Sequence, residues 1–102
     1  LYLSGQVAEN ASLDITGQTR EVLQRIDELL ATQGARREHI VSATIYLRTV
    51  GDYAAMNAVW DDWVPVNHTP ARATVGAKLI HPDYRIEIQA VAALSNGAAG
   101  EA

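Results

Sequence analysis

The chain of 102 residues contains no cysteine, which excludes a disulfide framework, a thiolate nucleophile and a metal site built from cysteines. It is also poor in positive charge, because 8 Lys and Arg residues stand against 12 Asp and Glu residues, a formal net charge of −4. A phosphate-binding surface needs a basic footprint, so this composition argues against nucleic acid as a partner. The absence of cysteine fits a cytoplasmic protein.

Long apolar runs and several motifs are missing as well. No stretch approaches the roughly 18 apolar residues of a membrane helix, and we expect no signal peptide before the first predicted strand. His39, His68 and His81 are widely separated and no HExxH pattern occurs, so we expect no metal site. Serine-hydrolase elbows, phosphate loops and dinucleotide fingerprints are also absent, and no organic cofactor is expected.

The apolar residues that are present follow two alternating periods. A period of two predicts strands over 1–7, 40–50, 70–80 and 85–93, and spacings of three and four predict helices over 14–33 and 53–64. Ser12 or Asp14 can cap the first helix, Gly34 can end it, and Asp52 can cap the second. This order predicts an α+β fold, a two-layer sandwich with two helices on one face of a mixed β-sheet. We expect residues 1–94 to form a single domain and 95–102 to form a flexible C-terminal tail.

Two charged residues stand out because they lie in otherwise apolar strands. Arg72 offers a planar grip on a carboxylate, and Glu87 has the chemistry to move a proton. The alternative is that both are solvated, or form a cross-strand ion pair worth under about 1 kcal/mol. If 70–80 and 85–93 formed a tight hairpin around Pro82-Asp83, the two side chains would be roughly 20 Å apart. Either the two strands are not neighbours, or a second copy of the chain supplies one of the groups.

Several separated motifs, in order, resemble the RidA/YjgF family of reactive intermediate deaminases. Its YoaB-like branch is among the candidates. The resemblance covers the chain from Leu1 to about Leu94 and is carried by Leu3-Ser4-Gly5-Gln6, Gln18-Thr19, Met56-Asn57, Pro70-Ala71-Arg72-Ala73-Thr74-Val75, Leu79 and Ile86-Glu87-Ile88-Gln89-Ala90-Val91-Ala92.

This resemblance implies a chorismate-mutase-like homotrimer with an active site in each subunit interface. The implied reaction is hydrolysis of reactive 2-imino or enamine acids to 2-oxo acids and ammonia, without a metal or cofactor, as metabolite damage control. It assigns Arg72 and Glu87 as catalytic residues. It assigns substrate binding to Ser4, Gly5, Asn57, Arg72 and Thr74.

Two departures from the family pattern bear on this prediction. Many members carry a cysteine where this chain has Thr74, so the function here cannot depend on a thiol at that position. Members also contribute an aromatic residue from a strand that precedes the Ser-Gly pair, and we expect such an N-terminal strand to be missing from the sequence as numbered. The main alternative is a non-catalytic module that binds small carboxylates as a sensor or partner switch. A second alternative is an isomerase of the trimeric chorismate mutase kind.

Overall fold

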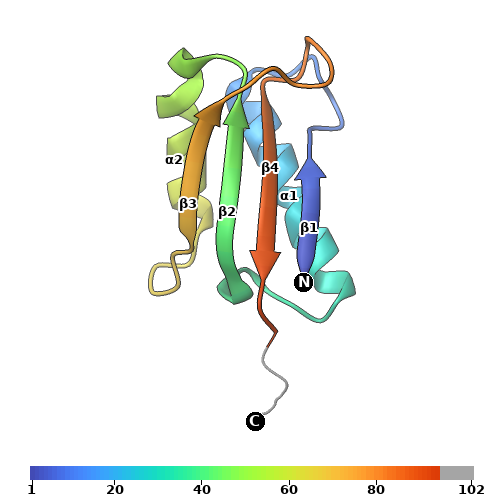
Figure 1. Ribbon diagram of the computed structural model, residues 1–102, viewed down its shortest axis with the longest axis vertical. Coiled ribbons are helices and arrows are strands. Elements are labelled where there is room, and N and C mark those ends of the chain that lie inside the picture. The colour runs from blue at the N-terminus through green and yellow to red at the C-terminus, as the bar shows by residue number, and fades with distance from the viewer. Residues whose placement is uncertain (95–102) are drawn as a thin grey trace.

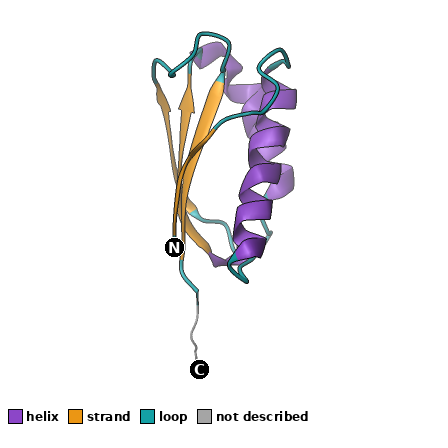
Figure 2. Cartoon of the chain, turned by 90° about the vertical axis from the view of Figure 1, so that its right-hand side faces the viewer, coloured by secondary structure: helices purple, strands orange, loops and turns teal. Residues whose placement is uncertain are grey.

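The computed structural model describes residues 1–94 and shows two layers, a four-stranded sheet and a pair of helices (Figures 1 and 2). The tail predicted for 95–102 lies outside the described residues. The α+β sandwich expected from the sequence is therefore confirmed, with both helices on one face of the sheet. In chain order the elements are β1 (Tyr2–Gln6), α1 (Ile15–Thr32), the 3₁₀ helix η1 (Arg37–His39), β2 (Ile40–Leu47), the 3₁₀ helix η2 (Val50–Asp52), α2 (Tyr53–Trp63), β3 (Ala71–Gly76) and β4 (Ile86–Ala92).

The strand order across the sheet is β1-β4-β2-β3, so β3 and β4 are not neighbours. Strand β2 lies between them, parallel to β3 and antiparallel to β4, and β1 is antiparallel to β4 at the other edge. The chain passes from β3 to β4 through a loop over residues 77–85 rather than through a tight hairpin. Of the two alternatives left open by the sequence, the structure confirms that the strands are separated.

The core lies between the sheet and the helices. Alternate residues of β2 and β4 are buried toward the helices, and α1 meets them with Val22, Leu23, Ile26 and Leu30. In the second helix, where aromatic and apolar residues at helical spacing predict core positions, Met56 and Trp60 are buried. Tyr53 is an exception, because 43% of it is exposed. The opposite face of the sheet carries no helix (Figure 2).

The ends of the helices follow local chemistry at two of three predicted positions. The Asp14 carboxylate accepts a hydrogen bond from the Gly17 amide at 2.8 Å and caps α1. Gly34 has a φ of 69°, the left-handed conformation predicted for it after the helix. Asp52 occupies the N-cap position of α2 as predicted, but its side chain makes no capping bond and instead accepts hydrogen bonds from the Arg85 guanidinium at 3.1 and 3.2 Å.

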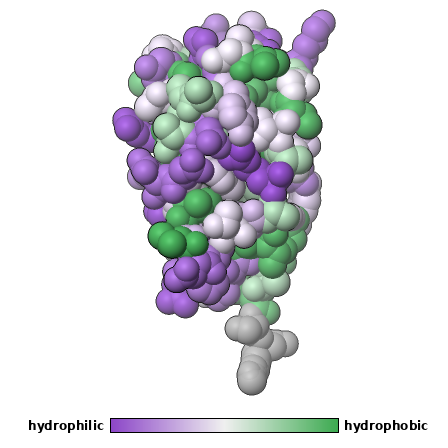
Figure 3. All heavy atoms as spheres, turned by 90° about the vertical axis from the view of Figure 1, so that its left-hand side faces the viewer, coloured by the Kyte–Doolittle hydropathy of each residue, from purple (hydrophilic) through white to green (hydrophobic). Residues whose placement is uncertain are grey.

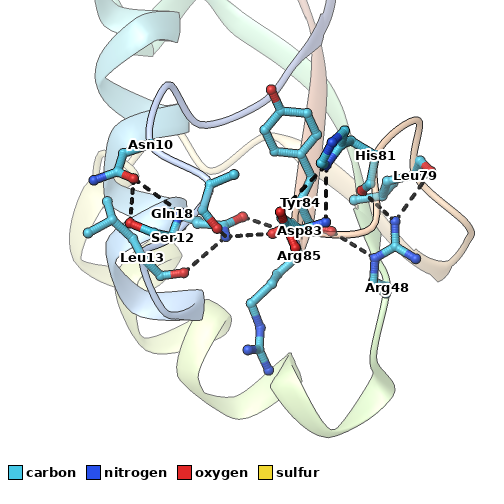
Figure 4. A network of polar contacts seen from close by, with 11 residues as sticks. Asn10, Ser12, Leu13, Gln18, Arg48, Leu79, His81, Asp83, Tyr84 and Arg85 are labelled. Carbon is cyan, nitrogen blue, oxygen red and sulfur yellow. Dashed lines mark hydrogen bonds and ion pairs between the residues drawn. The ribbon is translucent and has the colours of Figure 1, made fainter.

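A buried glutamine fastens the loop before β4 to the rest of the chain (Figure 4). The Gln18 side chain is fully buried and accepts a hydrogen bond from the Arg85 amide at 2.8 Å. Its amide nitrogen donates to the carbonyl oxygens of Ala11, Leu13 and Asp83. Because buried polar groups without partners are costly, this satisfied side chain fixes how β4 begins.

Arg48, at the end of β2, holds the same loop from the other side. Its guanidinium donates to the carbonyl oxygens of Tyr84 at 2.9 Å, His81 at 2.7 Å and Leu79 at 3.3 Å (Figure 4). A cleft of about 530 Å³ opens beside it, and Arg85 lines its wall as well. These arginines already bind carbonyl oxygens and Asp52, so we assign this cleft a structural role.

Candidate functional site

Arg72 lies on β3 with its side chain turned toward α2. It is level with Ala43 of β2, and both belong to the face of the sheet that the helices cover. Its Nη1 donates to the side-chain amide oxygen Oδ1 of Asn57 at 2.7 Å and its Nη2 donates to the Tyr53 hydroxyl at 3.0 Å. The guanidinium carbon also lies 5.5 Å from the ring centre of Trp60 and 5.7 Å from that of Tyr53. These contacts fix the position of the cation.

The helical period of about 3.6 residues places the residues of α2 that contact Arg72 on one side of the helix. Tyr53, Asn57 and Trp60 are spaced at i, i+4 and i+7, so they form one stripe of α2 beside β3. The Asn57 amide nitrogen donates to Asp61 at 3.2 Å, one further turn along. This bond turns the amide oxygen of Asn57 toward Arg72. We call Tyr53, Asn57, Trp60 and Arg72 the arginine cluster.

In the described part of the chain, Arg72 has no carboxylate partner, unlike two other arginines. Arg37 and Arg85 each pair with an aspartate, at 2.7 and 3.1 Å. These hydrogen bonds raise the pKa of each guanidinium above its ordinary value. Among the described residues, Arg72 forms no ion pair, and both of its acceptors are neutral. Its positive charge is therefore uncompensated, and three of its five N–H groups remain to bind an anion.

The hydroxyl of Thr74 shares this face of the sheet, two residues after Arg72. Within residues 1–94 it is a buried side-chain oxygen without a hydrogen-bond partner. A buried hydroxyl left unpaired costs about 1 to 3 kcal/mol. The structure therefore carries an unsatisfied polar group next to the arginine cluster.

A second group of predicted residues meets where β1 runs beside β4. The pairing register shifts between Leu3 and Gln6, which places a bulge at Ser4 and Gly5. A Cβ added at Gly5 would overlap the carboxylate of Glu87, whose Cδ is 2.7 Å from that position. The absence of a side chain at Gly5 therefore lets the Glu87 carboxylate lie against the β1 backbone. Ser4 is exposed beside it.

The two groups lie on opposite faces of the sheet. Glu87 is level with Tyr46 of β2 and alternates with the buried Ile86 and Ile88, so its side chain lies on the face without helices. Arg72 lies on the helix-covered face, two strands or about 10 Å away across the sheet and three residues, about another 10 Å, along it. One chain thus brings together Arg72, Asn57 and Thr74, and separately Ser4, Gly5 and Glu87, but it does not join the two sets.

The sequence did not predict Tyr53 and Trp60 as partners of Arg72, because a stripe of Met and aromatic residues is typical of a helix core. The signal that could have found them is the polar Asn57 within the same stripe, at the spacing that faces one neighbouring strand. Figure 3 looks onto this β3 and α2 edge, where a hydrophilic band crosses the middle between hydrophobic patches.

Neither a metal-binding cluster nor a membrane-spanning helix occurs among the described residues. No cluster of three or more His, Asp or Glu side chains there could hold a metal ion. No helix in that part of the chain has the length and apolar character to cross a membrane.

Fold and motifs together define a member of one family. The family model described as Endoribonuclease L-PSP matches residues 1–94. The RutC family protein YoaB of Escherichia coli is 46% identical over 94 residues, which cover 92% of this chain and 82% of the relative. A RutC family protein of Haemophilus ducreyi is 40% identical over 95 residues, covering 93% and 81%. The chain therefore belongs to the YjgF/RidA family, as the sequence motifs predicted.

Solved structures agree with this assignment. An uncharacterized protein from Pseudomonas aeruginosa superposes with a TM-score of 0.90 at 45% identity, covering 92% of this chain and 82% of the other. A member of the YjgF protein family from Neisseria meningitidis gives a TM-score of 0.86 at 49% identity, covering 89% and 76%. The fold of this chain is the fold of these proteins.

Proposed function

We propose that this protein hydrolyses reactive 2-imino or enamine acids to 2-oxo acids and ammonia, at sites formed between the subunits of a homotrimer. The observation that carries the proposal is the arginine cluster. It holds a guanidinium with neutral acceptors only, so Arg72 keeps its full charge for a substrate carboxylate. We place the reaction in the cytoplasm, because a chain without cysteine gains nothing from an oxidising compartment.

The proposed chemistry uses both groups of residues. Arg72 binds the substrate carboxylate and brings the imine carbon within about 3 to 3.5 Å of a water molecule. Glu87 of a neighbouring subunit takes a proton from that water as its oxygen bonds to the imine carbon. The same carboxyl group returns this proton to the nitrogen, which gives a carbinolamine. The carboxylate then passes the proton of the new hydroxyl group to the nitrogen, so the carbon–oxygen double bond forms as the carbon–nitrogen bond breaks and ammonia leaves. Backbone amides near Ser4 and Gly5 stabilise the polar groups that develop.

The separation of Arg72 and Glu87 supports a site between subunits. Neither side chain can cross the sheet to the other face, so a single chain supplies only one half of each site. The exposed sheet face that carries Glu87 also presents Tyr2, Val41 and Val75, apolar or aromatic residues suited to contact with another copy.

Ammonia release from enzymatically generated 2-iminobutanoate and 2-iminopropanoate tests the proposal. We expect the wild-type protein to accelerate release and Arg72→Ala to abolish the acceleration while the oligomer stays assembled. Arg20→Ala is the matched control, because Arg20 is an exposed arginine on α1 and should leave the rate unchanged. An undiminished rate in Arg72→Ala would contradict the assignment.

A second candidate is non-catalytic binding of small carboxylates, as a sensor or partner switch. It is favoured by one observation: the arginine cluster is complete within a single chain and needs no contribution from Glu87. In this case 2-oxobutanoate binds, Arg72→Ala removes the binding, and no imino acid is hydrolysed faster than in buffer.

A further inference from the structure

The Arg72 guanidinium has one end that is covered and one that is open. The bond from Nη1 to Asn57 is partly buried, whereas the bond from Nη2 to Tyr53 is exposed. A ligand carboxylate therefore approaches the Nη2 end, where the Tyr53 hydroxyl lies 3.0 Å from the nitrogen. Any oxygen that binds Nη2 from solvent has that hydroxyl beside it.

The Tyr53 hydroxyl is free to donate a hydrogen bond at this position. It accepts a hydrogen bond from Arg72, so its oxygen is already engaged as an acceptor. Its own O–H donates to no acceptor within residues 1–94. A phenol that accepts from a cation becomes a stronger donor, because neighbouring hydrogen bonds polarise one another.

We propose that Tyr53 is a second carboxylate-binding residue, whose hydroxyl orients the Arg72 guanidinium and donates its own proton to the ligand oxygen bound at Nη2. The inference rests on the proposed function for the identity of the substrate, a 2-imino monocarboxylate. The binding step itself needs only a small carboxylate. It extends the site by a residue that the family motifs of this chain do not include.

The variant Tyr53→Phe removes the hydroxyl and keeps the aromatic ring, so it tests the contribution of the hydroxyl alone. The phenylalanine ring keeps the cation–π contact with Arg72, and α2 keeps its buried residues, so the fold should not change. We expect the Kd for 2-oxobutanoate, measured by calorimetry, to rise about tenfold. The Kd for the uncharged 2-oxobutanamide should rise by a clearly smaller factor, because a neutral amide oxygen is a weaker acceptor than a carboxylate oxygen. In the deaminase assay KM should rise by a similar factor while kcat changes less than about twofold.

Tyr84→Phe is the matched control. Tyr84 lies in the loop before β4 and packs its ring against His81 with centroids 5.7 Å apart, at the Arg48 end of the molecule. Removing its hydroxyl should leave the Kd for 2-oxobutanoate unchanged. Melting curves of both variants check that the fold is intact.

The two proposals fail in different ways. If the wild-type protein binds 2-oxobutanoate but releases no ammonia, the deaminase proposal fails and the Tyr53→Phe titration still decides the role of Tyr53. An unchanged Kd in Tyr53→Phe overturns the inference. An equal loss of affinity for the acid and the amide also overturns the inference, because the hydroxyl would then not distinguish a carboxylate from an uncharged group. Absence of any carboxylate binding in the wild-type protein refutes both.

Discussion

Replacing Gly5 with alanine should cost activity and leave the fold intact. The new methyl group would occupy the space of the Glu87 carboxylate, whose Cδ is 2.7 Å from the Cβ position. An ordinary carbon–carbon contact is about 3.5 to 4.0 Å, so the carboxylate must move by roughly 1 Å. The backbone at Gly5 does not have a positive φ, and a glutamate end is flexible, so the shift is cheap in stability.

The same displacement of the Glu87 carboxylate should slow the reaction strongly. A misplacement of about 1 Å in a catalytic group costs roughly 100-fold, so we expect kcat for 2-iminobutanoate to fall by about two orders of magnitude. Ammonia release under saturating substrate measures kcat, and a thermal melt measures stability. Gly51→Ala is the matched control, because a Cβ there meets nothing closer than Thr49 Cγ2 at 3.8 Å. It should match the wild type in both measurements.

A double-mutant cycle with Glu87→Gln tests the physical reason for the loss. If Gly5→Ala acts by displacing Glu87, it should lower the rate little further once the carboxylate has been replaced by an amide. Wild-type kcat in Gly5→Ala refutes the reasoning, and so does a full 100-fold loss in both backgrounds.

Three further predictions follow from individual contacts. Asn57→Asp places a carboxylate on the Arg72 guanidinium, so the Kd for 2-oxobutanoate should rise at least about tenfold at low salt, more than in Asn57→Ala, and an equal effect of both variants would contradict a charge-based reason. Thr74→Val removes a buried hydroxyl that lacks a partner, so urea unfolding should show unchanged or up to about 1 kcal/mol higher stability, and a clear loss of stability would contradict it. Gln18→Leu leaves the Arg85 amide without its acceptor, so the same urea assay should show a loss of about 2 to 4 kcal/mol, and a loss below about 1 kcal/mol would show that water replaces the bonds.

Local patterns predicted the elements and several of their ends. Alternation placed the four strands, and the spacing of apolar residues placed both helices, because a half-buried strand and an amphipathic helix each impose their own period. Predicted strands ran long at two ends: 40–50 ends at Leu47 and 70–80 ends at Gly76. At both places the chain leaves the sheet while the alternation of residue types continues for a few more positions.

The order in which the strands pair could not be predicted from residue periodicity. Nothing in the period of β3 or β4 indicates that β2 pairs between them, because that depends on the β2-α2-β3 crossover and on the residues that anchor the loop over 77–85. Gln18 and Arg48 supply much of that anchoring, and neither has a local signal for it. Asp52 shows the same limit: its sequence context favours a helix cap, but the Arg85 side chain competes for its carboxylate.

The candidate site was predicted as a set of residues and not as two groups. Family motifs named Ser4, Gly5, Asn57, Arg72, Thr74 and Glu87 together, and the structure divides them between the two faces of the sheet. The division could not be read from the chain, since it follows from the pairing of each strand. The role of Tyr53 was missed because aromatic residues at helical spacing usually pack inside.

Subunit complementation tests the central claim, that each active site takes Arg72 from one chain and Glu87 from another. Arg72→Ala and Glu87→Gln proteins, each far less active than the wild type on its own, are mixed in equal amounts, unfolded and refolded together. In a trimer with random mixing, about a quarter of the sites then join an intact Arg72 to an intact Glu87, so about a quarter of the wild-type rate of ammonia release should return. A mixture no more active than its two components would show that no site is shared between chains.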